Sequence, residues 1–253
     1  ALSYTDLAVT NGTSYSYYVT ALYSNPTKKS EPSNSVDVTP TTIEFVIIGT
    51  GTSVSTNGQN SPINISNNST HGQLVYTAAE LNAAGVTGPV LISGLGFDVV
   101  SAPLYPITDF LVRMKHTTAT NCAVWQNADG LISTYSNASY MPTAGDWDML
   151  MFSTPFEWNG VDNILVDTAF GLLSQSNRSG TLRYTNSDQS YRFAYSNTAD
   201  QTNVFTDGLL VTRRYNIRFA LQNIPAGPEI SVNPSSIPFG NVPVNTSSIQ
   251  QFS

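Results

Sequence analysis

The sequence predicts an all-β protein, with a central jelly-roll or β-sandwich domain and partial β-sandwich modules on either side. Charged residues make up only 11% of the 253 residues, against about 25% in an average globular domain. Hydrophobic residues make up 40%, which is enough to fill a core and argues against disorder caused by excess charge. Short segments of alternating polarity recur between turns rich in Asn, Gly, Ser and Pro, as is typical of sandwiches and jelly rolls.

The N-terminal stretch predicts two strands joined by a polar loop. Tyr15, Tyr17, Val19 and Ala21 occupy alternate positions, which is the period of a strand. The stretch SNPTKKSEPSN follows as a loop, and SVDVTP is a second alternating strand that ends at Pro40.

This stretch resembles the second half of a fibronectin type III domain. Leu7, Gly12 and Tyr15 match that family's corner, in which a tyrosine hydroxyl ties the loop to the next strand. The segment Ser30–Pro40 matches the ending of such a domain. Its earlier strands are missing, so the resemblance implies that the chain begins within the domain, and we assign residues 1–41 to its C-terminal part.

Residues 42–222 are predicted to form one jelly-roll-like β-sandwich domain. The best helical signal is Tyr76–Ala84, with Thr77 as its N-cap, Glu80 as the capping-box partner and Gly85 as its stop. The strand candidates are spaced regularly between turn residues: Glu44–Gly49, Val90–Val99, Thr108–His116, Leu131–Tyr135, Asp148–Phe152, Asn163–Asp167, Leu182–Asn186 and Asn216–Leu221. The expected core contains Phe97, Phe110, Val112, Leu150, Phe152, Ile164, Val166 and Phe219.

The central segment also resembles a known jelly-roll module. The segments GTGTSVSTNG, YTAAELNAAGV, FLVRMKHTT, YMPTAGDW, PFEWNGVDNILVD and NIRF carry the resemblance. That module recurs in large secreted proteins of Gram-negative bacteria, between fibronectin-type and other immunoglobulin-like domains. The resemblance therefore implies an architecture rather than a reaction.

Residues 223–253 are predicted to begin a further domain. The pattern I-x-V-x-P-x-S-x-x-F-G-x-V, from Ile230 to Val242, resembles the opening of hydin-like immunoglobulin-type modules in long secreted bacterial chains. A complete sandwich of that type needs about seven strands, so the resemblance implies that the chain ends within the module. Together the resemblances make the chain a fragment of a large, secreted, multi-domain bacterial surface protein, with partial immunoglobulin-like β-sandwich modules flanking the central domain.

Charge and cysteine content exclude several partners. The net charge is −7, and the basic pairs Lys28-Lys29 and Arg213-Arg214 are too short for a nucleic-acid footprint. No apolar run approaches the length of about 18 residues that a membrane span needs. Cys122 is the one cysteine, so no internal disulfide can form. With the polar composition, this favours an extracellular or cell-surface bacterial protein.

Few residues offer catalytic chemistry. The two histidines are His71, predicted to lie in a loop, and His116, at a strand end. A pair of His116 with Cys122 is conceivable, but a small half-buried cysteine is the favoured interpretation. No zinc-ligand spacing or phosphate loop is present. We therefore expect a non-enzyme with no cofactor, and a structural calcium ion remains an open alternative.

Paired acids are the better catalytic candidates. Asp146 and Asp148 bracket Trp147, and Asp162 and Asp167 flank Asn163–Val166. Glycosidases use two carboxylates about 5–9.5 Å apart. A glycoside hydrolase on a jelly-roll scaffold is therefore the second alternative function.

Aromatic residues provide the ligand-binding candidates. Trp125, Tyr135 and Tyr140 lie in polar surroundings, where exposed rings could stack against sugars. Trp147 and Trp158 follow strand periodicity and are better explained as core residues. If the three candidates share one concave face, they favour the first alternative function, a carbohydrate-binding module attached to a secreted hydrolase.

The leading functional prediction is a non-catalytic extracellular module with a structural or adhesive role. Strands such as Tyr15–Tyr23 would expose unpaired backbone groups if their neighbours were missing. The expected partners are therefore adjacent domains of the same long chain or neighbouring subunits that add strands. Glycans are a candidate ligand, whereas nucleic acid and a membrane span are not expected.

Overall fold

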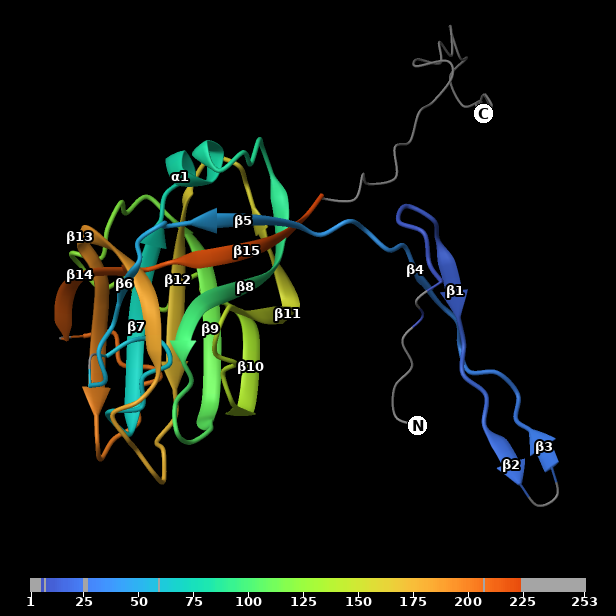
Figure 1. The fold of residues 1–253 in the computed structure, drawn as a ribbon. Coiled ribbons are helices and arrows are strands. Elements are labelled where there is room, and N and C mark those ends of the chain that lie inside the picture. The colour runs from blue at the N-terminus through green and yellow to red at the C-terminus, as the bar shows by residue number, and fades with distance from the viewer. Residues whose placement is uncertain (1–5, 7, 25–26, 59, 207, 224–253) are drawn as a thin grey trace, which may run out of the picture. The chain divides into compact units, whose positions relative to one another are not determined.

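The computed structural model describes residues 6, 8–24, 27–58, 60–206 and 208–223 (Figure 1). The chain divides into two compact units, residues 1–223 and 224–253, and the described residues all belong to the first. Leu7 and almost all of the predicted hydin-like module therefore lie outside the described residues, and the predicted domain boundaries remain predictions.

The N-terminal segment forms a two-stranded hairpin. Strand β1 (Tyr15–Tyr17) pairs antiparallel with β4 (Val36–Val38), and β2 (Leu22–Ser24) pairs with β3 (Thr27–Lys29). Between the two ladders, the backbone N–H groups of Ser30 and Ser33 donate to Ala21 and Val19. The predicted polar loop therefore contributes strand β3.

The corner expected around Tyr15 has the hydrogen bond that the resemblance implied. The Tyr15 hydroxyl accepts from the backbone N–H of Thr10 at 2.9 Å, which fixes the loop five residues upstream. Membership of the fibronectin type III family itself stays a prediction.

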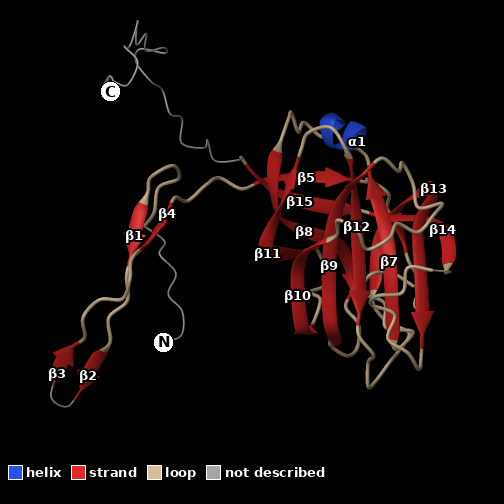
Figure 2. Cartoon of the chain, turned by 180° about the vertical axis from the view of Figure 1, so that it is seen from behind, coloured by secondary structure: helices blue, strands red, loops and turns tan. Residues whose placement is uncertain are grey.

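The larger part of the described chain is an all-β sandwich of the jelly-roll class. Its eleven strands are β5 (Glu44–Ile48), β6 (Ser53–Val54), β7 (Ser69–Tyr76), β8 (Val90–Ser101), β9 (Ile107–Thr117), β10 (Ile132–Tyr140), β11 (Trp147–Trp158), β12 (Asn163–Phe170), β13 (Thr181–Ser196), β14 (Leu209–Tyr215) and β15 (Ile217–Gln222). They form one curled antiparallel sheet, ordered β10-β9-β12-β7-β13-β8-β15-β5, with β11 on β8 and with β14 and β6 on β13. The curl places one layer, β11-β8-β15-β5, against a second layer, β10-β9-β12-β7-β13-β14 (Figures 1 and 2).

All eight strands predicted for this domain are present, and most are longer than predicted. Three strands were not predicted, the short β6 and the longer β7 and β14. Every residue of β7 is buried, so its sequence STHGQLVY lacks the alternation that marks a half-buried strand. The prediction that His71 lies in a loop is therefore wrong, because His71 is in the middle of β7.

The single predicted helix is confirmed. Helix α1 (Ala78–Ala83) begins after Thr77, whose side chain accepts from the backbone N–H of Glu80, and Glu80 bonds back to the backbone of Thr77. This capping box satisfies two of the free N–H groups at the helix start. Gly85 follows the helix with a φ of +97°, the conformation that glycine adopts most readily.

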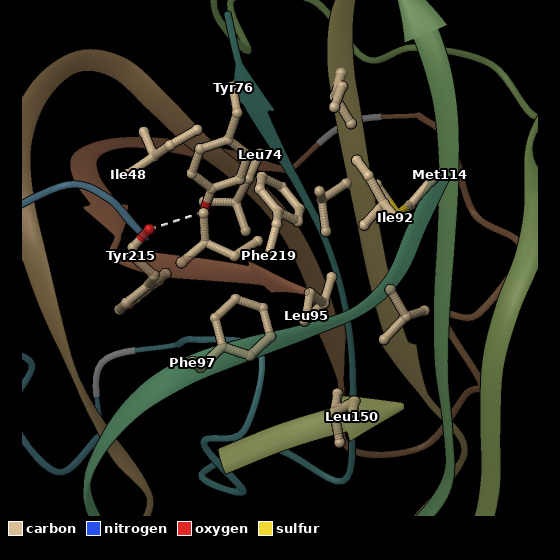
Figure 3. Packing of buried hydrophobic residues seen from close by; sticks show 14 of the residues in the cluster. Ile48, Leu74, Tyr76, Ile92, Leu95, Phe97, Met114, Leu150, Tyr215 and Phe219 are labelled. Atoms are coloured by element: carbon tan, nitrogen blue, oxygen red, sulfur yellow. Dashed lines mark hydrogen bonds between the residues drawn. The ribbon is translucent and has the colours of Figure 1, made fainter. Parts of the chain in front are cut away.

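One hydrophobic core fills the space between the two layers (Figure 3). In it, the hydroxyl of the buried Tyr76 donates to the carbonyl of Tyr215 at 2.7 Å. The predicted core residues that are buried are Phe97, Phe110, Val112, Leu150, Ile164, Val166 and Phe219. Phe152 is only partly buried at the edge of the core, so its predicted placement was wrong.

The two tryptophans predicted to fill the core differ in how deeply they are buried. Trp158 is fully buried, and its indole N–H donates to the carbonyl of Asp162 at 2.7 Å. Trp147 is only partly buried, with the Arg218 guanidinium 4.9 Å from its ring centroid. The core assignment is therefore confirmed for Trp158 and wrong for Trp147.

Candidate functional site

Polar side chains gather on the outer face of the second layer, on the side away from the core. Along β7, Leu74 and Tyr76 belong to the core, so His71 and Gln73 face outward. Strand β12 lies between β7 and β9, and its Asp167 stands opposite Gln73 on one side and Arg113 on the other. We call His71, Gln73, Arg113 and Asp167 the outer-face cluster. Its four members are buried, because loop 118–131 and loop 197–206 cover them.

Asp167 is the centre of the cluster. Its carboxylate accepts from His71 Nε2 at 2.7 Å, from Gln73 Nε2 at 2.9 Å and from Arg113 Nε at 2.8 Å. Burial by itself raises the pKa of this carboxyl, but the hydrogen bonds and the charges of His71 and Arg113 outweigh it and hold the pKa below the ordinary 3.8. Asp167 is therefore a buried carboxylate whose charge is balanced within the fold.

His71 has both ring nitrogens engaged. Its Nδ1 lies 2.8 Å from the carbonyl oxygen of Val204, which can only accept, and its Nε2 faces Asp167. The rings of Trp125 and Phe205 pack against the imidazole, each with a centroid distance of 4.9 Å. No ring nitrogen is left to take a proton from a substrate, so the His71–Asp167 pair has a structural arrangement rather than that of a general base.

Arg113 connects the sheet to loop 197–206. Its terminal nitrogens donate to the side chain of Asn203 at 3.0 Å and to the carbonyl of Thr202 at 2.7 Å. The guanidinium also lies over the ring of Phe205, 5.3 Å from the centroid. These contacts, with the bond from His71 to Val204, hold the loop against the outer face.

Loop 118–131 is held by a second set of contacts. The Gln73 amide donates to the carbonyl of Gln126 and accepts from its N–H, both at 2.9 Å. Lys115 Nζ donates to the backbone and side-chain oxygens of Asn127 at 2.8 and 3.2 Å and to the carbonyl of Asp129 at 3.1 Å. Because Gln73 also binds Asp167, the position of this loop depends on the outer-face cluster.

An open groove of about 460 Å³ lies beside the fixed loop. One wall is the end of β9 and the residues that follow it, and loop 118–131 and the turn before β12 complete the lining. The lining residues are Lys115, His116, Thr117, Thr118, Gln126, Asp129, Gly130 and Asp162. This groove is the candidate binding site.

Cys122 and His116 have separate structural roles. The Cys122 thiol donates to the carbonyl of Gln73 at 3.2 Å, and burial raises its pKa to about 12, so the thiol stays protonated at neutral pH. His116 Nε2 accepts from the backbone N–H of Asn159 at 3.2 Å, and its ring packs on Phe156. The conceivable Cys–His pair therefore lacks an activated nucleophile.

The three predicted sugar-binding aromatics do not share one exposed face. Tyr140 is 5% exposed and stacks on Phe110 in the core, with Tyr135 packed beside both rings. Trp125 lies on loop 118–131 and packs against His71. The proposed platform of Trp125, Tyr135 and Tyr140 is therefore not formed.

The four predicted acids also have separate surroundings. Asp148 accepts from the Tyr140 hydroxyl, Asp162 accepts from the Asn159 amide at 2.7 Å, and Asp146 is exposed. Asp167 belongs to the outer-face cluster, and the groove contains only Asp162 of the four. Among the described residues, no group of three His, Cys, Asp or Glu side chains could hold a metal ion.

Sequence reasoning missed Gln73, Arg113 and Lys115. One signal for the cluster was available in the sequence. Asp167 interrupts the apolar run NILVDTAF, and a charged residue inside a buried strand usually has a partner. The partners of that charge could not be read from spacing, since Arg113 is 54 residues away.

The similarity of this chain to known proteins is low. No family model and no curated protein matches the chain. One similar solved structure comprises the cysteine protease and lectin-like domains of Cwp84, a surface layer associated protein of Clostridium difficile. Its sequence identity to this chain is 9% and its TM-score is 0.35, and the match covers 62% of this chain and 32% of that one. Another is the clostridial cysteine protease Cwp84 after propeptide cleavage, with 9% identity and a TM-score of 0.37, over 75% of this chain and 42% of that one. The chain thus spans less than half of either structure.

Proposed function

We propose that this chain is a non-catalytic module of a larger protein at the cell surface or outside the cell, with a structural or adhesive role. The observation that carries the proposal is that the buried reactive groups His71, Asp167 and Cys122 are held by hydrogen bonds within the fold. The nitrogens of His71 and the carboxylate of Asp167 are fully engaged in hydrogen bonds within the fold, and Cys122 is a protonated, buried thiol. A catalytic group must reach its substrate, and these groups do not reach solvent.

The second candidate function is carbohydrate binding. The observation that favours it is the open polar groove beside loop 118–131, whose backbone is fixed by Gln73 and Lys115. Binding residues are commonly carried by loops held on a rigid scaffold, and a loop that is already ordered loses less entropy when a ligand binds.

The N-terminal hairpin supports a role next to other domains or subunits. Tyr15 stands opposite Val38 and Tyr17 opposite Val36, so the four side chains share one face of the hairpin. Val36 is 61% and Val38 48% exposed. An isolated two-stranded hairpin is marginally stable in water, and we propose that a neighbouring domain or subunit covers this face.

A screen for turnover tests the non-catalytic assignment. Incubation of the chain with libraries of glycans, esters and peptides is expected to give no product above the protein-free blank. Asp148 and Asp162 come from the two predicted acid pairs, so Asp148→Asn and Asp162→Asn are the informative variants. Asp37→Asn, on the exposed strand β4, is the matched control. Turnover that either variant abolishes, with an unchanged melting temperature, would contradict the proposal.

A further inference from the structure

We propose that the groove beside loop 118–131 binds neutral saccharides by hydrogen bonds to neighbouring hydroxyl groups. This inference names a ligand class for the carbohydrate-binding candidate and rests on the module being non-catalytic. The groove has hydrogen-bonding atoms without partners among the described residues, a lining with more negative than positive charge, and a loop that Gln73 and Lys115 hold in place.

Two carboxylates supply oriented acceptors. Asp129 Oδ2 accepts from the side-chain amide of Asn127 at 2.7 Å, and Asp162 Oδ2 accepts from that of Asn159, also at 2.7 Å. Each carboxylate is therefore fixed by one oxygen. Within the described residues, no hydrogen bond is made to the other oxygen, Oδ1, of either aspartate, so one oriented acceptor remains on each.

Two side chains supply donors. His116 Nε2 accepts from the N–H of Asn159, so the proton of the neutral ring is on Nδ1, which can donate. The backbone of Gln126 is bound on both sides by Gln73, and its side-chain NH₂ makes no hydrogen bond within the described residues. A sugar hydroxyl both donates and accepts, so a lining with carboxylate acceptors next to amide and imidazole donors matches adjacent hydroxyls.

The charge of the groove favours neutral ligands. Lys115 is the one cation in its lining, and its ammonium already donates to three oxygens, as many as it has N–H groups. Asp129 and Asp162 carry two negative charges against this one positive charge, and the whole chain carries −7. Uronates, sulfated sugars and other anionic saccharides would therefore be repelled.

An NMR titration tests the inference on the full chain. The probes are the neutral hexasaccharides of glucose in β-1,4 and α-1,4 linkage, of mannose and of N-acetylglucosamine, with hexagalacturonate as the anionic comparison, each up to about 10 mM so that a Kd near 1 mM is detected. At least one neutral hexasaccharide is expected to shift the amide signals of Thr118, Gln126 and Gly130 in a saturable way.

Variants locate the site. Asp162→Asn and Gln126→Ala should each weaken binding about tenfold, since each removes one hydrogen bond to the ligand. Gln126→Ala keeps the backbone contacts to Gln73, so it separates loss of a ligand contact from loss of the loop's position. Asp146→Asn, a carboxylate outside the groove lining, should leave the affinity unchanged.

Each outcome has a defined meaning. Absence of binding to every neutral hexasaccharide, tighter binding of hexagalacturonate, or shifts unaffected by both groove variants would overturn the inference and leave the non-catalytic assignment intact. Cleavage of a bound saccharide would instead overturn the proposed function.

Discussion

Replacing Asp167 by alanine is expected to destabilise the folded chain by about 3–5 kcal/mol, the usual cost of removing one partner from a buried ion pair. The side chain of Asp167 is fully buried, and its removal leaves His71 Nε2 and the Arg113 guanidinium facing each other without the negative charge between them. It also removes the acceptor that holds the Gln73 amide. Chemical unfolding in urea measures the change in the free energy of unfolding.

The matched control is Asp146→Ala. Asp146 is exposed, so its replacement is expected to change the free energy of unfolding by less than about 0.5 kcal/mol. A cost below about 1 kcal/mol for Asp167→Ala would show that the outer-face cluster is not a buried, interdependent network.

The stability difference between wild type and Asp167→Ala should also depend on pH. The pKa of Asp167 is lower in the folded chain than its ordinary 3.8. Its stabilising contribution is therefore present above pH 3.8 and is lost as the pH falls through the lower, folded-state pKa. The difference should shrink below about pH 4, and a difference that grows there would contradict this assignment.

Truncating Phe219 to alanine is expected to cost about 3–5 kcal/mol, because it would leave a cavity in the centre of the sandwich. Phe219 is fully buried and meets the Tyr76 ring edge-on, with the centroids 5.8 Å apart. Phe152 is the matched comparison, since the same truncation at its partly buried position should cost only about 1–2 kcal/mol. Equal costs for the two variants, measured by denaturant unfolding, would contradict the observed core.

The features that sequence could predict are those set by local patterns. The capping box at Thr77 and Glu80 is encoded within four residues, and the structure contains it as predicted. Strands such as β9 and β12 have one face in the core, so alternating or apolar runs mark them. The buried positions of Phe97 and Phe219 follow from the same periodicity.

The candidate site could not be predicted in the same way because it depends on long-range packing. Strand β7 is buried on both faces, and its outer face is covered by loops that lie about 50 and 130 residues further along the chain. In the sequence, the polar residues His71 and Gln73 are therefore typical of a loop, whereas in the structure they lie in a strand in the interior of the sheet. Tyr140 shows the reverse case, because its polar neighbours indicated exposure whereas its ring packs on Phe110.

The outer-face cluster fixes loop 118–131 through Gln73, which binds both Asp167 and Gln126. Hydrogen exchange of the Gln126 amide tests it directly, because that N–H donates to the side chain of Gln73. Exchange in wild type should be much slower than at Val161, whose N–H lies in an exposed turn, and Gln73→Ala should accelerate it at least about a hundredfold while the amides of β12 stay protected. An equally fast Gln126 exchange in wild type and variant would show that the cluster does not hold the loop.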